Sequence, residues 1–147
     1  MLFHGPDLQG IEYVEGCGER GIAAWVATAP PPSEWIDRPL RQAWLSDPLA
    51  LDCAFQLLIL WSVSQSGAGS LPTRVGRYRQ FRRAFPPGGA RIVAQVTQAA
   101  AHRAVADIEF LDAEGTPVAR IEDYECVIDA SLNRAFRRDG SAQVELK

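Results

Sequence analysis

One long run of apolar residues constrains the fold of this chain more than any other feature. Most of residues 47–64 are leucine, alanine, isoleucine, phenylalanine, tryptophan or valine. Asp47 can cap the first helical turn by accepting a backbone hydrogen bond, and Pro48 suits the first helical position, where an N–H has no partner within the helix. The run therefore predicts one long helix, and a helix that is apolar on all sides is buried.

Two polar residues, Asp52 and Gln56, interrupt this predicted helix. They are four residues apart, so their side chains project from one helix face and can contact the same small group. Moving a carboxylate into apolar surroundings is costly and raises its pKa, which suits a general acid near neutral pH. The alternative is structural: Asp52 bonds a loop backbone within the core, and Gln56 satisfies buried backbone groups.

Whole-chain properties exclude several classes of protein. The chain has 147 residues, near the commonest domain size, with 47% hydrophobic and 22% charged residues, as in a globular protein. Its net charge of -3 argues against nucleic acid as the main partner, because phosphate binding needs a basic surface. Cys17, Cys53 and Cys126 form no CxxC motif or Cys/His cluster, so we expect reduced thiols, a cytoplasmic location and no metal site.

The ends of the chain and its apolar runs give no sign of a membrane protein. No basic segment followed by an apolar run opens the sequence, and the run 57–61 is too short to cross a bilayer. We therefore expect neither a signal peptide nor a membrane partner. The abrupt start, Met1-Leu2-Phe3-His4-Gly5-Pro6, suggests a piece excised from a longer multidomain protein.

Short segments of alternating apolar and polar residues surround the predicted helix. Most of them are separated by glycine- or proline-rich turns, as expected for antiparallel strands. Residues 16–18 are expected to form a turn, residues 66–70 a flexible connector, and residues 30–45 a loop that covers the core or a substrate channel. The predicted strands are residues 11–14, 21–29, 73–83, 91–98, 104–111 and 117–128.

These elements predict an α+β protein with a hotdog fold, in which a curved antiparallel sheet of about six strands wraps around one long buried helix. A doubly wound parallel fold is excluded, because it needs a helix for each crossover. The whole chain, residues 1–147, is expected to form a single domain. Its core spans residues 1–129, and the extension 130–147 docks through Leu132 and Phe136 and then frays.

Four motifs of the chain resemble those of a known family. His4-Gly5-Pro6-Asp7-Leu8-Gln9 resembles an opening motif in which Tyr or His precedes Gly-Pro and a Gln follows. Residues 47–56 resemble a helix motif with His-Pro, Leu-Asp and Gln, although Asp47 stands where many members carry His. Leu71-Pro72 before an arginine-rich strand, and the Asp-x-x-Gly-x-x-Val pattern of residues 112–118, also match.

Over residues 3–128 the chain resembles the C-terminal half of the dehydratase domain of polyketide synthases and polyunsaturated fatty acid synthases, a double hotdog. The resemblance implies removal of water from a β-hydroxyacyl thioester on the phosphopantetheine of an acyl carrier protein, without a further cofactor. In this family a histidine takes the α-proton, and an aspartic acid protonates the leaving hydroxyl. Asp52 matches that aspartate, and Gln56 matches the residue that orients it and contacts the hydroxyl. Substrate-binding roles are implied for His4, Gly5, Pro6, Leu71 and Pro72.

The catalytic histidine of the family belongs to a His-x-x-x-Gly-x-x-x-x-Pro pattern in the N-terminal hotdog, and this sequence has no such pattern. Its two histidines are His102, expected at a surface turn, and His4, which could hydrogen-bond Asp52, line the pocket or act as the base. We therefore predict half of an active site, completed by the N-terminal hotdog of the same synthase or by a partner subunit. Because an isolated hotdog exposes a sheet edge, we also expect a homodimer.

Three alternatives stay open at this point. The arginines of one predicted strand form a solvated face, or they contact the acidic carrier protein or the phosphate of its pantetheine arm; they are Arg74, Arg77, Arg79, Arg82 and Arg83. A hotdog thioesterase would use Asp52 as an ionised base that activates water. A degenerate dehydratase-like module would bind the acyl chain without catalysis.

Overall fold

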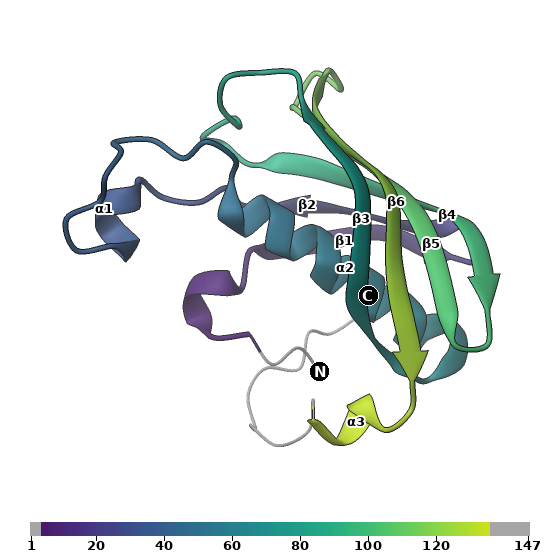
Figure 1. Cartoon of the computed structure of the whole chain (residues 1–147). Coiled ribbons are helices and arrows are strands. Elements are labelled where there is room, and N and C mark those ends of the chain that lie inside the picture. The colour runs from purple at the N-terminus through teal and green to yellow at the C-terminus, as the bar shows by residue number, and fades with distance from the viewer. Residues whose placement is uncertain (1–3, 136–147) are drawn as a thin grey trace.

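An antiparallel sheet curves around one central helix in the computed structural model, which describes residues 4–135 (Figure 1). The sheet order is β1-β2-β4-β5-β6-β3, and every neighbouring pair is antiparallel. The predicted hotdog arrangement is therefore confirmed, with β1 and β3 as the two edges. In chain order the elements are η1 (Pro6–Leu8), β1 (Ile11–Gly18), β2 (Gly21–Val26), α1 (Pro32–Trp35), α2 (Pro48–Ser66), β3 (Gly69–Gln80), β4 (Ala90–Ala100), β5 (Arg103–Leu111), β6 (Pro117–Asp129) and α3 (Leu132–Ala135).

The central helix α2 starts where the sequence predicts. An Asp47 carboxylate oxygen accepts a hydrogen bond from the Ala50 N–H at 2.8 Å, and Pro48 occupies the first helical position. The same carboxylate accepts the Ala29 N–H at 2.9 Å, which ties the end of β2 to the start of the helix. Gly67, at φ 70°, ends the helix in the left-handed conformation that glycine adopts without strain.

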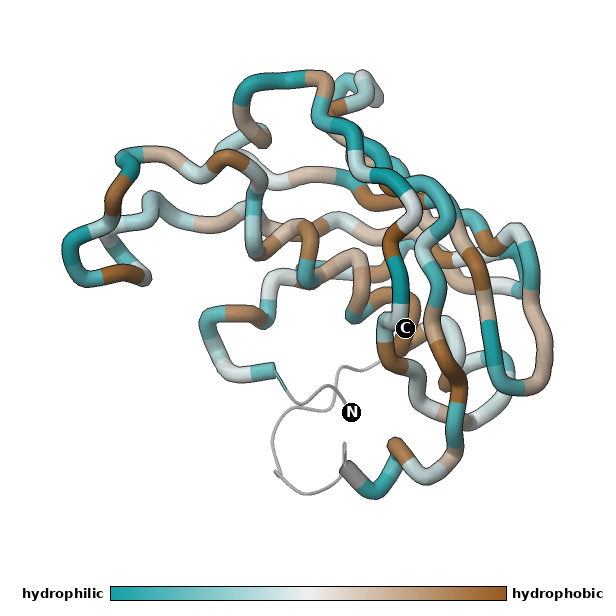
Figure 2. The backbone as a smooth tube through the Cα atoms, viewed as in Figure 1, coloured by the Kyte–Doolittle hydropathy of each residue, from teal (hydrophilic) through white to brown (hydrophobic). Residues whose placement is uncertain are grey.

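The core lies between α2 and the concave face of the sheet. Figure 2 shows apolar residues recurring along the helix and along the strands that flank it. Leu57, Leu58, Ile92, Ile108 and Ile121 are among the fully buried side chains, and each contributes about 1.5–3 kcal/mol relative to an exposed position. By length and composition alone α2 is long enough to span a membrane, contrary to the argument from residues 57–61. Burial of ten of its residues accounts for its apolar character as a core helix.

Two turns predicted from glycine content are strands instead. β1 continues through Gly16-Cys17-Gly18 and pairs with β2 up to Gly18 opposite Gly21, so the turn falls at residues 19–20. β3 begins at Gly69 within the predicted connector, where the Gly69 N–H donates to Asn133 Oδ1 and the Ser70 hydroxyl donates to the Leu58 carbonyl. Both differences arise because pairing with a neighbouring strand outweighs the low strand propensity of glycine.

Two register irregularities change which β3 side chains face the helix: one in β3 between Pro72 and Arg74, and a bulge in β6 opposite the β5 residues Ala106 and Ile108. Asp123 has φ 53°, and a Cβ on Gly76 opposite it would lie 2.7 Å from Asp123 Cβ, so the two strands approach closely here. Val75 consequently pairs with the buried Tyr124, and Tyr78 pairs with the buried Ile121. Val75 therefore lies on the same side of the sheet as α2.

At the C-terminal end, Leu132 is half-buried in α3, which packs beside β3, as expected for a docked extension. The second predicted docking residue, Phe136, and the predicted fray lie outside the described residues. His102 is exposed in the turn between β4 and β5, as predicted.

Candidate active site

The structure brings Asp52, Gln56 and His4 together at one side of α2. The Gln56 side-chain Nε2 donates to Asp52 Oδ2 at 2.6 Å, and His4 Nε2 lies 3.4 Å from the same oxygen. The predicted proximity of Asp52 to Gln56 and to His4 is therefore confirmed. Their roles in chemistry stay predictions.

Asp52 is less buried than the sequence suggests. Its side chain is 27% exposed, whereas that of His4 is 10% exposed and residue Gln56 is 1% exposed. Pro48, Phe55 and Val63 on the same side of α2 are also only half-buried. The expectation of a carboxyl enclosed in the core is wrong for this chain by itself, because the sheet leaves this side of the helix uncovered.

An N-terminal segment lies alongside α2, and we call its residues 4–10 the strap (Figure 1). The Gln56 Nε2 donates a second hydrogen bond, at 2.7 Å, to the Leu8 carbonyl, and Gln9 Nε2 donates to the His4 carbonyl at 3.1 Å. A Cβ on Gly10 would lie 2.8 Å from Cys53 Sγ, so only glycine permits this approach of the strap to the helix.

Gly5 and Pro6 of the strap shape η1. The Gly5 carbonyl accepts the Leu8 N–H at 3.0 Å, and Pro6 occupies the first position of the short helix. Both residues are exposed. Their predicted contact with substrate stays a prediction, and what the structure shows is that they fix the path between His4 and Leu8.

β3 passes the carboxyl on its other side. The Ser70 hydroxyl donates to the Leu58 carbonyl at 3.2 Å, and the Tyr78 hydroxyl interacts with Ser46 just before α2, so β3 and α2 run in opposite directions. The strand residues between Ser70 and Tyr78 therefore pass alongside the helical turns that carry Asp52.

Of the two predicted β3 residues, only Pro72 lies on the side of the sheet that faces α2. Pro72 pairs with the buried Cys126, which places it on the helix side of the sheet. Leu71 pairs with the exposed Val127 and lies on the opposite face, where it is 36% exposed. The predicted contact between the Leu71 side chain and substrate at Asp52 is therefore not supported by its position.

An apolar surface that the sequence did not reveal lies next to Asp52. Val75 is 42% exposed although it lies on the helix side of the sheet. Its neighbour Tyr124 stacks on Phe55, with ring centroids 5.3 Å apart. We call Asp52, Phe55, Pro72 and Val75 the open face. Periodicity could not identify it, because the register shift between Pro72 and Arg74 and the bulge at Asp123 together decide which way Val75 points.

The cysteines and possible metal ligands offer no second reactive centre in the part of the chain that is described. Cys17, Cys53 and Cys126 are free thiols, and burial raises the pKa of Cys53 to about 12, which disfavours a reactive thiolate. Within residues 4–135, no group of three or more His, Cys, Asp or Glu side chains is placed to hold a metal ion.

Three of the five arginines on β3 and just after it form ion pairs with acidic side chains. Arg77 and Arg79 both pair with Glu122, and Arg82 pairs with Asp112 at 2.7 Å. Hydrogen bonding by the Thr116 backbone N–H, the largest influence, together with Arg82, lowers the pKa of Asp112. These pairs favour a solvated face with partners for several of its arginines over a phosphate-binding cluster.

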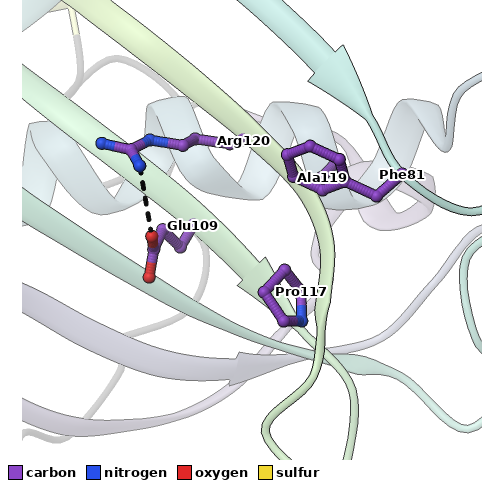
Figure 3. Close-up of a pocket in the computed structure, with 5 residues that line it drawn as sticks. All are labelled: Phe81, Glu109, Pro117, Ala119 and Arg120. Atoms are coloured by element: carbon purple, nitrogen blue, oxygen red, sulfur yellow. Dashed lines mark ion pairs between the residues drawn. The ribbon is translucent and has the colours of Figure 1, made fainter.

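A shallow cavity of about 300 Å³ lies on the sheet face away from α2 (Figure 3). It is lined by Phe81, Glu109, Pro117, Ala119 and Arg120, and Arg120 pairs with Glu109 at 3.7 Å. The cavity is largely apolar, and its only acid is already paired. We therefore place the candidate site at Asp52.

The sheet order and the single core helix define a hotdog protein, and the carboxyl–amide pair on that helix is suited to acid–base chemistry. The chain belongs to the polyketide synthase dehydratase family: residues 1–129 match the family model described as polyketide synthase dehydratase N-terminal domain. The predicted family is thus confirmed, whereas the assignment to the C-terminal half is not confirmed by this match. A comparison with curated protein sequences gives no significant match.

Solved dehydratase domains share the fold. A dehydratase domain of a mycocerosic acid synthase-like polyketide synthase is 26% identical with a TM-score of 0.66, over 90% of this chain and 45% of that one. The dehydratase domain of PpsC from Mycobacterium tuberculosis is 24% identical with a TM-score of 0.63, over 86% and 46%. The dehydratase domain of the CurJ module of curacin polyketide synthase is 19% identical with a TM-score of 0.66, over 86% of this chain and 43% of that one. The chain thus spans less than half of each of these structures.

Proposed function

We propose that this chain takes part in the dehydration of β-hydroxyacyl thioesters on an acyl carrier protein, in polyketide or fatty acid biosynthesis. Asp52 acts as the general acid. The observation that carries the proposal is the Asp52 carboxyl, held by Gln56 on the one side of α2 that the sheet leaves uncovered. A general acid needs both a fixed orientation and access to the group it protonates.

The chemistry requires a base as well as this acid. The base takes the α-proton, the released electron pair forms the Cα=Cβ bond, and the Cβ–O bond breaks as Asp52 protonates the leaving hydroxyl to give water. We propose that the base is a histidine of an N-terminal hotdog half, which covers the open face. This chain would then supply the acid half, as its Asp52 and Gln56 motif and its lack of the family's histidine pattern indicate.

The uncovered surface supports this incomplete-site proposal. Val75 on the helix side of the edge strand β3 is 42% exposed, and Phe55 on α2 is only half-buried. Exposed apolar groups beside an unpaired strand edge favour association with another sheet. When isolated, the chain is expected to form a homodimer through this edge, and light scattering that shows a monomer at micromolar concentration would count against that expectation.

The proposed substrate is an acyl chain carried on phosphopantetheine, and the reaction needs no other cofactor. The PpsC structure was obtained with C12:1-CoA, an acyl thioester with the same pantetheine arm, which supports a thioester substrate here. We propose that His4, Gly5, Pro6 and Pro72 line the substrate site. We propose a cytoplasmic synthase as the setting.

Mass spectrometry on a β-hydroxyacyl pantetheine thioester tests the proposal. The assay compares this chain alone with the chain joined to a histidine-bearing hotdog of the same synthase. Loss of water only in the joined protein supports the proposal. Loss of water by the chain alone would refute the need for a second half.

The same assay separates the two other functions. Release of the free acid would identify a thioesterase, in which an ionised Asp52 activates water. A folded joined protein that binds the thioester and leaves it unchanged would identify an acyl-binding module without catalysis.

A further inference from the structure

We propose that His4 is a positioning residue for Asp52: together with Gln56 it engages Oδ2, so that Oδ1 is the oxygen that delivers the proton. This inference rests on the proposed dehydration and assigns atoms within the same site. It differs from the role that the resemblance implies for His4, which is contact with substrate.

The hydrogen bonds of Gln56 set the first constraint. Its side-chain Nε2 carries two hydrogens, and these are directed to the Leu8 carbonyl at 2.7 Å and to Asp52 Oδ2 at 2.6 Å. No N–H of this amide is left for a substrate hydroxyl, and the residue is 1% exposed. Gln56 therefore orients Asp52 and does not donate to the substrate.

His4 adds a second nitrogen at the same oxygen. Its Nε2 lies 3.4 Å from Asp52 Oδ2, close enough for a polar contact with that oxygen. A protonated carboxyl carries its hydrogen on one oxygen, and the oxygen that accepts hydrogen bonds is the unprotonated one. With Oδ2 engaged by Gln56 and His4, the proton resides on Oδ1, which is the atom free to reach the leaving hydroxyl.

Burial and direction argue against His4 as the base. The His4 side chain is 10% exposed, so less of it is open to a substrate than of Asp52, which is 27% exposed. Its Nε2 points to the acid, whereas a base must lie within hydrogen-bonding reach of the α-carbon proton. The position of His4 therefore fits the acid side of the reaction.

The strap holds His4 in place before any substrate arrives. Gln9 Nε2 donates to the His4 carbonyl, and Gly10 packs against Cys53 on α2. The strap thus reaches the acid in two ways: by the hydrogen bonds of Gln56 to the Leu8 carbonyl and to Asp52, and by the 3.4 Å contact of His4 with Asp52. Catalytic groups fixed in advance lower the activation barrier, because no reorganisation is needed during the reaction.

Kinetics of the complete site, with the histidine-bearing half present, test this inference with two substitutions. His4→Gln places an amide nitrogen close to the original Nε2 but cannot act as a base, and His4→Phe keeps the ring shape without any donor. We expect His4→Phe to lower kcat about 10- to 100-fold, because small displacements of catalytic groups have effects of this size. KM should stay within about twofold, and His4→Gln should restore most of kcat.

Each other outcome overturns the inference. Equal loss of kcat in both variants would identify His4 as the base, a change confined to KM would identify a substrate contact, and no change in either would show a structural residue only. Asp52→Asn is measured in parallel: if it dehydrates normally, the proposed function itself fails. Thermal unfolding of each variant checks that the fold is kept.

A second measurement does not depend on activity. In the chain alone, NMR of the histidine ring nitrogens should show that Asp52→Asn changes the chemical shifts of His4 and leaves those of His102 unchanged. His102, in the exposed turn between β4 and β5, serves as the internal control. Unchanged His4 shifts would refute the contact between His4 and Asp52.

Discussion

Replacement of Asp47 by alanine should destabilise the protein by roughly 2–4 kcal/mol. The carboxylate accepts the Ala50 N–H at 2.8 Å as a helix cap, and the loss of such a cap costs about 1 kcal/mol. It also accepts the Ala29 N–H at 2.9 Å, and leaving this part-buried donor without a partner costs roughly 1–3 kcal/mol. The two costs add, because different backbone groups lose their acceptor. Burial of the carboxylate, which raises the pKa of Asp47, offsets part of them and favours the lower half of this range.

Urea unfolding followed by circular dichroism measures this effect. With a denaturant slope of about 2 kcal/mol per molar, a loss of roughly 3 kcal/mol moves the midpoint down by about 1.5 M. Ser33→Ala, at an exposed position of α1, is the control and should change the midpoint little. A shift of less than about 0.3 M for Asp47→Ala would refute the reasoning, because neither hydrogen bond could then matter.

Three further predictions follow from the strap, the open face and the β5–β6 turn. Gly10→Ala should lower the free energy of unfolding by about 1–3 kcal/mol and also lower kcat, because the new Cβ would lie 2.8 Å from Cys53 Sγ and displace the strap. An unchanged kcat would show that the position of the strap does not affect the acid. Val75→Lys should abolish the proposed dimer, as measured by light scattering, because it places a charge on the open face. Val127→Lys, on the opposite face of the sheet, is the control and should leave the dimer intact. Equal effects of the two substitutions would contradict an interface on the open face. The pKa of Asp112 is lowered in the folded protein, so its stabilisation is present above its unfolded pKa and lost as pH falls through the folded one. Asp112→Asn should therefore destabilise at neutral pH but not in strong acid, as pH-dependent thermal unfolding would show.

The sequence was sufficient to predict the central helix because its signals are local. Asp47 and Pro48 mark the start of α2 by their backbone chemistry, and the apolar composition reports burial directly. The four-residue spacing of Asp52 and Gln56 likewise follows from helix geometry, so their hydrogen bond could be expected before the fold was known.

Strand faces were harder to predict, because one residue can reverse them. Asp123 takes a positive φ without being glycine, and nothing in its local sequence marks it. Together with a register shift between Pro72 and Arg74, the bulge places Val75 beside Tyr124 instead of on the outer face with Arg77. Gly16, Gly18 and Gly69 caused a different error. Their glycine content predicts turns, but they lie in paired strands.

The surroundings of the acid could be predicted only in part. The bond from Gln56 to the Leu8 carbonyl joins residues 48 positions apart, and no periodicity encodes such a contact. The exposure of Asp52 was also misjudged, because composition reports that a helix is apolar but not which side its sheet leaves uncovered.

The central claim is that Asp52 is the acid of a dehydratase site. The most direct test is the rate of water loss from a β-hydroxyacyl pantetheine thioester by the complete site, with and without Asp52→Asn. Asp37→Asn, at an exposed loop position, is the matched control. The account predicts that Asp52→Asn lowers kcat by about 10²- to 10⁴-fold and that Asp37→Asn leaves it unchanged. Normal water loss by a correctly folded Asp52→Asn protein would contradict it.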